Sequence, residues 1–572
     1  MKGPSKFFLM VLFFNFPLHA QIILDTPTYI AVPHEYYKND AMKEKFAIEL
    51  YSKAFNFEFF NPSMAIDTYD DFYDRFKGDK SPVIHEYLAK SLLRKALLLS
   101  TIGHNNAAFS CFNKLILHLD KSESSNDQQY VALAFFYKAT LLARMQKTQE
   151  ALSEYDKFLS INRSGQDDLK QERIIALLNK GILLKDNNQF QAALDTYDSL
   201  LQLFGKYNDP FIEEELAKCL YNKALLLEDM KQPEKAVIVY QTVIDRFQNA
   251  DRNELQEIVI SSLFNQANTL KKINIFDKSI DDYDKIINKF KDTKSITIKE
   301  KVIFSFINKA LLLNDMGKAS EAILFLNKAI DLFSANNDKY MQEAIAKVLF
   351  DKGVILGKIS KRNEAIFFYD AVITRFLSSI PTMEEDTAAA FFNKAILLAE
   401  DKRTQEAIKT YDEIYTRFKA SKSPPVENII SGALFNKGIA YSMLHQREAA
   451  LAAYDKLLSR YKDSDNPVII QDVTSALFNK ASLTNLLGHP DEAVDLYDKL
   501  INHFKDRSSP TIALIVAESF FNKAVILDHL EKSEEAATVF DALIVYLKDF
   551  PSSEMQQWGE KARLYRSKIM QK

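Results

Sequence analysis

The sequence predicts an all-α protein, a solenoid of about twelve helix–turn–helix repeats. The tetrapeptide Phe-Asn-Lys-Ala, or a near copy of it, returns every 42 or 43 residues along almost the whole chain. In each copy, apolar residues recur at helical spacing on both sides of a polar break, which predicts two helices. The 572 residues include only 13 Gly and 15 Pro, which leaves little for loops. A fixed period of this size is typical of stacked arrays whose units touch only their neighbours.

The N-terminal residues 1–20 have the layout of a secretory signal peptide. Two lysines give a basic start, residues 7–14 are apolar, and Ala20 stands at the expected cleavage position. The apolar run is too short to span a bilayer as a helix, which takes about 20 apolar residues. We expect cleavage after Ala20 and export to the periplasm or cell surface, with residues 21–40 as a leader. If the segment is not cleaved, we expect it to pack on the first repeat of a cytoplasmic protein.

Residues 41–551 form the repeat array, and the first helix of each repeat carries the recurring tetrapeptide. The residue three before its lysine is Leu or Phe in all twelve copies, and the residue after it is always Ala or Gly. A position restricted to Ala and Gly indicates that two helices approach closely there. We call the third residue of the tetrapeptide the lysine position and number its neighbours from it. Its members are Lys53, Lys95, Lys138, Lys180, Lys223, Gln266, Lys309, Lys352, Lys394, Lys437, Lys480 and Lys523.

The turn and the second helix follow in a fixed order. Glycine occurs eight residues after the lysine position in three repeats, at Gly103, Gly317 and Gly488, which predicts the turn there. The second helix opens on a column of Ala, and an aromatic residue, usually in a Tyr-Asp pair, follows four residues later. A proline 13 residues before the lysine position predicts the start of the next first helix. These prolines are Pro82, Pro210, Pro381, Pro424, Pro467 and Pro510.

The C-terminal residues 552–572 lie beyond the last repeat. Their pattern predicts one helix with a polar face that covers the final hydrophobic face of the array. Solenoids need such a cap to stay in solution.

The order of large, small, turn, Ala and aromatic residues resembles the tetratricopeptide repeat. Two features depart from that family. Its period is about 34 residues, so each unit here has eight or nine more, which predicts longer helices. The lysine also stands where the family usually has Leu, and the family's usual Trp is absent from the array. The resemblance implies a right-handed superhelix that binds proteins or peptides along a concave groove and has no enzymatic activity.

An asparagine precedes the lysine position in eight repeats. The resemblance implies that this position lies on or near the concave face, where an asparagine ladder would hold an extended peptide. An amide suits that role because it donates and accepts hydrogen bonds at once. The alternative is that the amide bridges adjacent helices, because a residue repeated without variation is more often structural. The candidate peptide-binding residues are Asn179, Asn222, Asn265, Asn308, Asn393, Asn436, Asn479 and Asn522.

The columns on either side of the asparagine and lysine bear on the same question. A lysine stem can cover apolar surface while its ammonium reaches the Asp of a Tyr-Asp pair, which predicts a structural role for the lysine. Position −2 is mostly aromatic or aliphatic and position +2 mostly apolar. Either the groove is hydrophobic, or the longer helices bury both columns. The sequence leaves these two alternatives open.

The composition and motifs exclude several classes of function. The 73 basic and 77 acidic residues nearly balance, which argues against a nucleic-acid partner. The sequence has no Gly-rich phosphate loop, no HExxH and no CxxC, and its nine histidines are scattered, so we predict no enzyme, cofactor or metal site. We also expect no integral membrane segment in the mature chain. The sequence therefore favours a scaffold that binds proteins or peptides to support assembly of a complex; the alternative is an exported factor that binds or assembles a polysaccharide or cell-wall polymer.

Overall fold

A computed structural model describes residues 39–571, apart from residues 121, 123, 162–168, 337, 377–382, 508 and 551. The predicted signal peptide therefore lies outside the described residues. Within the described ranges the chain forms 25 α-helices and one short 3-10 helix, with no β-strand. The all-α prediction is confirmed.

The helices form twelve pairs, as predicted. The first helices are α1 (Asp40–Phe60), α3 (Pro82–Thr101), α5 (Ser125–Arg144), α7 (Lys170–Asp186), α9 (Pro210–Asp229), α11 (Asn253–Lys272), α13 (Ile296–Asp315), α15 (Lys339–Lys358), α17 (Glu384–Glu400), α19 (Pro424–Met443), α21 (Pro467–Leu486) and α23 (Pro510–His529). The second helices are α2 (Pro62–Phe76), α4 (Asn105–Leu119), α6 (Thr148–Ser160), α8 (Phe190–Phe204), α10 (Pro233–Phe247), α12 (Phe276–Phe290), α14 (Ala319–Phe333), α16 (Arg362–Phe376), α18 (Thr404–Phe418), α20 (Arg447–Tyr461), α22 (Pro490–Phe504) and α24 (Ser533–Tyr546). The chain ends with η3 (Leu547–Asp549) and α25 (Ser553–Ile569).

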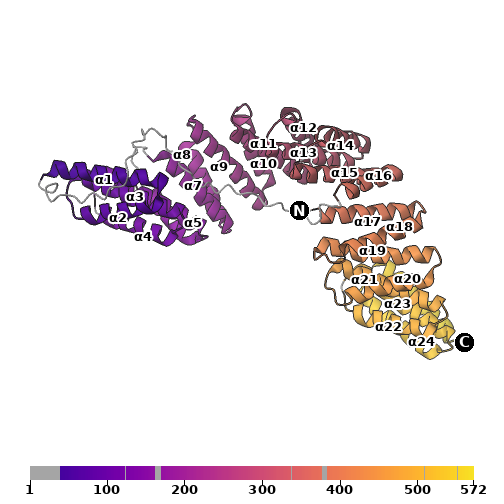
Figure 1. Cartoon of the computed structure of the whole chain (residues 1–572). Coiled ribbons are helices and arrows are strands. Elements are labelled where there is room, and N and C mark those ends of the chain that lie inside the picture. The colour runs from indigo at the N-terminus through magenta and orange to yellow at the C-terminus, as the bar shows by residue number, and fades with distance from the viewer. Residues whose placement is uncertain are drawn as a thin grey trace. The chain divides into compact units, whose positions relative to one another are not determined.

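The chain divides into two compact units, and the boundary between them along the sequence falls in α12, between Asp282 and Tyr283. Within each unit, a second helix packs against the first helix before it and the first helix after it (Figure 1). First helices such as α9 have 20 residues and second helices such as α10 have 15. The expectation of lengthened helices is therefore confirmed.

The helix boundaries follow the predicted proline and turn positions. Proline is the first residue of α3, α9, α19, α21 and α23, while Pro381 lies outside the described residues. Eight residues after the lysine position, the backbone adopts a positive φ in eleven repeats, whether the residue is Gly103 (84°) or Lys231 (60°). A residue in this conformation ends an α-helix and turns the chain, and only glycine adopts it without steric cost.

The core of nine repeats holds a buried tyrosine of the second helix, which is replaced by Phe112, Leu326 and Phe540 in the other three. Tyr454 of α20 is 1% exposed and lies against Gly438 of α19. A Cβ added to Gly438 would come within 2.3 Å of the Tyr454 ring, and one added to Gly181 would meet the Tyr197 ring at the same distance. The column restricted to Ala and Gly therefore marks a close approach of first and second helices.

The last helix, α25, packs against α23 and α24 and repeats part of the first-helix pattern. Arg566 stands 25 residues after Asp541, the spacing that usually separates an Asp from the lysine position of the following repeat. Its Nε lies 2.6 Å from Asp541 Oδ1. This helix thus contacts the Asp of the twelfth repeat as the lysine of most repeats contacts the Asp of the repeat before it.

One described helix, α23, is long and apolar enough to cross a membrane by length and composition alone. In the structure it packs against α21, α22, α24 and α25, as a first helix of the array does. Core helices of this kind commonly pass the same test.

Candidate binding face and contacts between repeats

The lysine position joins successive repeats through ion pairs. In eight repeats the ammonium contacts the Asp of the preceding Tyr-Asp pair, at 2.5 Å for Lys480 Nζ and Asp455 Oδ1. The lysine side chain is mostly covered while the carboxylate stays about half-exposed, at 19% and 55% for this pair. The eight pairs are Lys95–Asp70, Lys180–Asp156, Lys223–Asp198, Lys309–Asp284, Lys394–Asp370, Lys437–Asp412, Lys480–Asp455 and Lys523–Asp498. The structural role predicted for the lysine is confirmed.

Three contacts between repeats depart from this pairing, and in one of them both partners change. Where the lysine position is Gln266, the facing residue is Gln241, and the two amides are hydrogen-bonded at 3.1 Å. Lys352 donates to Asn327, which takes the place of the usual Asp. The pair between the second and third repeats is missing, because Asn113 replaces the Asp and Lys138 instead contacts Glu154 of its own repeat at 3.2 Å.

The asparagine column forms a second row of contacts between repeats. In five repeats its amide hydrogen-bonds the hydroxyl of the buried tyrosine on the second helix of the preceding repeat. For Asn479 and Tyr454 the donor nitrogen lies 3.3 Å from the hydroxyl oxygen. The five pairs are Asn179–Tyr155, Asn393–Tyr369, Asn436–Tyr411, Asn479–Tyr454 and Asn522–Tyr497. Asn265 donates at 3.0 Å to the hydroxyl of Tyr221, which lies on the first helix of the preceding repeat.

The sequence predicts this contact when the asparagine column is compared with the aromatic position of the preceding repeat. All eight asparagines follow a repeat whose aromatic position is Tyr. Where that position is Phe112 or Leu326, which have no hydroxyl, the asparagine is replaced by Tyr137 or Asp351. In the second repeat Arg94 takes the place, and both it and Tyr69 bond to Glu58. The alternative that the amide bridges adjacent helices therefore describes these six contacts.

The eight asparagines of the predicted ladder differ in how deeply they are buried. Asn179 is 2% exposed, which withdraws it from any ligand-binding face, and its Oδ1 is buried without a hydrogen-bond partner in the described part of the chain. The other seven asparagines are half-buried. Burial raises the pKa of the Tyr369 hydroxyl to about 12, and the hydrogen bond from Asn393 works against that shift. Peptide binding by the seven half-buried amides stays a prediction.

The two apolar columns beside the lysine are mostly half-buried, and position −2 is fully buried more often than position +2. Position −2 packs inside its own repeat: Leu93, Phe136, Leu178 and Ile307 are buried, and rings such as Phe478 lie against the tyrosine of the second helix, with centroids 5.8 Å apart for Tyr497. Position +2 is half-buried in every repeat except that of Ile182. Position −2 is thus buried in four repeats and half-buried in eight, whereas position +2 is buried in one and half-buried in eleven.

Two further columns of the first helices vary in chemistry and were not identified from the sequence. Position +6 is exposed in all twelve repeats. Its members are Phe59, Thr101, Arg144, Asp186, Asp229, Lys272, Asp315, Lys358, Glu400, Met443, Leu486 and His529. Position −5 is half-buried in eleven repeats and varies as widely, from Lys218 to Phe304 and Gly432. Both columns could have been identified from the sequence, because their residues vary from repeat to repeat while the neighbouring columns stay constant.

Titratable groups among the described residues do not assemble into a metal site. No group of three or more His, Cys, Asp or Glu side chains in the described ranges is placed to hold a metal ion. Burial raises the pKa of the Asp351 carboxyl, nearby Asp386 raises it further, and Lys347 opposes both. Asp351 Oδ2 is buried without a hydrogen-bond partner in the described part of the chain. This acid is a substituted member of the asparagine column.

Comparisons with known families match individual repeats. The tetratricopeptide repeat family matches residues 217–249, 305–336 and 432–464, which fall on α9–α10, α13–α14 and α19–α20. The family of anaphase-promoting complex subunit 5 matches residues 54–116 and 103–180. No curated protein matches the sequence.

Solved structures with a related arrangement share little sequence. The apo form of RapI is 13% identical over 65% of this chain and 96% of that chain, with a TM-score of 0.40. A tetratricopeptide repeat protein from Parabacteroides merdae is 16% identical over 50% and 93%, with a TM-score of 0.30. The apo quorum sensor NprR from B. thuringiensis is 11% identical over 72% and 97%, with a TM-score of 0.34.

Proposed function

The chain is a tetratricopeptide repeat protein, and from this premise we propose that it binds an extended peptide or protein segment along its first helices and scaffolds an assembly. The observation that carries this proposal is the column at position +6, exposed in every repeat and different in chemistry from one to the next. Recognition of a specific partner requires such variation between repeats. Columns that only join repeats have no reason to vary.

The proposed binding face consists of positions −5, −1, +2 and +6 of the first helices. Successive members are three or four residues apart, so they lie on one face of each helix. The two variable columns flank the asparagine at −1 and the partly open apolar residue at +2. A bound peptide would meet apolar surface and amides at a constant spacing and would be selected by the variable side chains.

The test is selection of binding peptides from a displayed random library on the full chain. Met443 and Leu486 occupy position +6 of neighbouring repeats and are 59% and 62% exposed. We expect Met443→Glu with Leu486→Glu to abolish binding of peptides selected on that region. The matched control is Leu324→Glu with Phe367→Glu, which changes exposed apolar residues on second helices and should leave binding intact. Equal loss in both double variants would contradict the proposed face.

The asparagine ladder belongs to the same proposal and needs its own control. Asn393→Ala, Asn436→Ala and Asn479→Ala remove both the amide and its bond to a tyrosine. Tyr369→Phe, Tyr411→Phe and Tyr454→Phe remove that bond and keep the amide. If the amides bind peptide, only the alanine set weakens binding. A glycan array in the same experiment separates peptide binding from the alternative of polymer binding.

Export of the chain is also proposed, on the layout of residues 1–20. Sequencing the N-terminus of the protein purified from its source tests it. A mature chain that begins at Gln21 supports export, and a chain that retains residues 1–20 contradicts it.

A further inference from the structure

Three titratable side chains meet at the junction between the second and third repeats. They are His85 of α3, His118 of α4 and Asp127 of α5. The centroids of the two imidazole rings lie 4.9 Å apart, with 33° between the ring planes. His85 Nδ1 lies 3.6 Å from Asp127 Oδ2. None of the three belongs to the proposed binding face, so the cluster does not depend on the proposed function.

The other repeats show that this cluster is a departure from the array. Asp127 occupies position −11 and is 7% exposed. The place of His118 is filled in the tenth repeat by Arg460, which donates at 2.9 Å to Glu427, in the place of His85. Two imidazoles thus replace an ion pair. In the other eleven repeats position −11 is apolar, as Met42, Ile84, Leu169, Ile212, Leu255, Ile298, Met341, Met383, Val426, Ile469 and Ile512.

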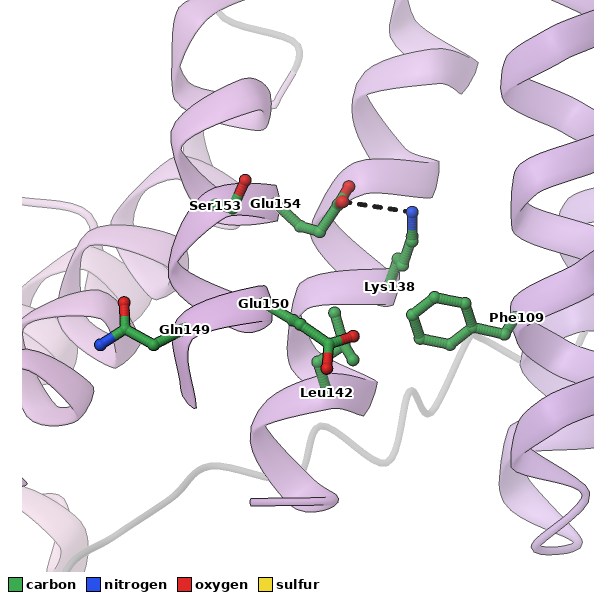
Figure 2. Close-up of a pocket in the computed structure, with 7 residues that line it drawn as sticks. All are labelled: Phe109, Lys138, Leu142, Gln149, Glu150, Ser153 and Glu154. Atoms are coloured by element: carbon green, nitrogen blue, oxygen red, sulfur yellow. Dashed lines mark hydrogen bonds and ion pairs between the residues drawn. The ribbon is translucent and has the colours of Figure 1, made fainter. Parts of the chain in front are cut away.

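The same junction lacks the ion pair found at most others. Because Asn113 replaces the usual Asp, Lys138 contacts Glu154 of its own repeat (Figure 2). A pocket of about 350 Å³ stays open beside this contact, with Phe109 in its lining. A change of charge in the histidine cluster therefore acts on a junction that the lysine position does not tie together.

The cluster is well accommodated while its imidazoles are neutral. The buried Asp127 carboxylate accepts from Ser122 Oγ at 2.5 Å and lies beside His85. Histidine gains its charge as pH falls through about 6.5. A first proton on the ring pair lies next to a carboxylate, whereas a second would place two positive charges within 5 Å of each other, which costs free energy at a partly buried site.

The surroundings of His118 oppose its charged form. Its Nε2 is buried and has no hydrogen-bond partner in the part of the chain that the structure describes. Protonation makes both ring nitrogens donors, so charged His118 would hold a buried donor without an acceptor. Burial and nearby His85 lower the pKa of His118, and Asp127 opposes both. The unfolded state then binds the proton more tightly, so stability falls as pH drops through the unfolded-state pKa.

Other charged groups on the surrounding helices are engaged elsewhere. The helix α4 packs against α3 and α5. On α3, Glu86 pairs with Lys90 at 2.7 Å. On α4 itself, Lys114 lies over a tyrosine ring of α2, and Asp120 is exposed to solvent. Asp127 is therefore the acid that answers a positive charge in the cluster.

We propose that His85, His118 and Asp127 form a pH-sensitive joint, which loosens the contact between the second and third repeats as pH falls below about 6.5. Above this pH the neutral rings stack, and Asp127 is held by Ser122 and His85. In acid the charge on His118 weakens the packing of α4 on α3 and α5. The loosening stays local, because a repeat touches only its neighbours.

The test is native-state hydrogen exchange of the full chain at about pH 7.5 and about pH 5.5, corrected for the intrinsic exchange rate. We expect opening of α4 and α5 to increase at least about threefold in acid relative to opening of α19 and α20. His118→Gln should remove this difference. Asp127→Asn should enlarge it, because it removes the carboxylate that favours a charged ring. A merely structural role for Asp127 predicts no such change with pH.

The matched control is His503→Gln. His503 is exposed and occupies the place of His118 in the eleventh repeat, where Ile470 and Ile512 stand in the places of His85 and Asp127. This variant should respond to pH as the parent chain does. An equal response of α4–α5 and α19–α20 in the parent chain, or an acid response of α4 and α5 that survives His118→Gln, would overturn the proposal.

Discussion

The contact between the tenth and eleventh repeats (α19–α22) and the contact between the second and third (α3–α6) use the same positions differently. In the first, Tyr454 accepts from Asn479 and Asp455 pairs with Lys480. In the second, Phe112 and Asn113 stand in place of the Tyr-Asp pair. Lys138 is redirected to Glu154, and an open pocket results.

This difference indicates that the constant polar columns of the array join neighbouring repeats. The lysine and the asparagine are matched to partners one repeat earlier, and the asparagine is absent where its tyrosine is replaced by Phe112 or Leu326. A substitution that breaks the match leaves unused polar groups and space. Binding capacity is therefore to be sought at variable columns, rather than at the most regular residues.

The largest expected effect on stability comes from the tenth repeat, where Gly438 lies against the Tyr454 ring. Gly438→Ala places a Cβ that meets the Tyr454 ring. We expect a destabilisation of about 1–3 kcal/mol, because the ring is buried on all sides. Native-state hydrogen exchange in α19 and α20 measures it locally, since a repeat array need not unfold as one unit. Gly78→Ala, which meets no atom within 4 Å, is the control and should cost much less.

A substituted member of the asparagine column should respond to pH. Because burial raises the folded-state pKa of Asp351, the native state binds the proton more tightly than the unfolded state does, and stability falls as pH rises through that pKa. Asp351→Asn removes the buried charge and should stabilise α15 by about 1 kcal/mol at pH 7. The gain should vanish at pH values below the unfolded-state pKa. An equal gain at both pH values would contradict the assignment.

Removing an asparagine amide between the tenth and eleventh repeats should change the free energy of unfolding by a similar amount, but as a destabilisation. Asn479→Ala removes one of the two side chains, Asn479 and Ser442, that hydrogen-bond the Tyr454 hydroxyl, for an expected cost of about 1 kcal/mol. The same change at Asn179 should cost at least as much, because that amide is the more deeply buried. Thermal midpoints with hydrogen exchange of α21 and α7 compare the two sites.

The smallest effect is expected at an exposed ion pair. Asp455→Asn should cost at most about 1 kcal/mol, and the loss should shrink in high salt, because the carboxylate is about half-exposed. Asn113→Asp should give the opposite change at the contact between the second and third repeats, a gain of a few tenths of a kcal/mol, by providing Lys138 with the usual partner. Unfolding measured at two salt concentrations distinguishes these outcomes.

Much of this structure follows from the sequence, because the period fixes the helix pairs and the Tyr-Asp pair predicts the partner of the lysine. The partner of Asn479 was not predicted, because its signal links two columns one repeat apart. The redirection of Lys138 to Glu154 depends on the reach of a side chain between three helices, which periodicity does not encode. Exposure at Met443 and Leu486 also required the packed structure, since their spacing alone fits a core.

The most direct test of these matched columns is a pair of double-mutant cycles. One combines Lys480→Met with Asp455→Asn, and the other combines Lys138→Met with Asn113→Ala, each read by hydrogen exchange in α21 or α5. Methionine keeps the apolar stem, so the cycle isolates the charge contact. We predict a favourable coupling of about 0.3–1 kcal/mol for Lys480 with Asp455 and none for Lys138 with Asn113. Equal coupling in the two cycles, or none for Lys480 with Asp455, would contradict the account.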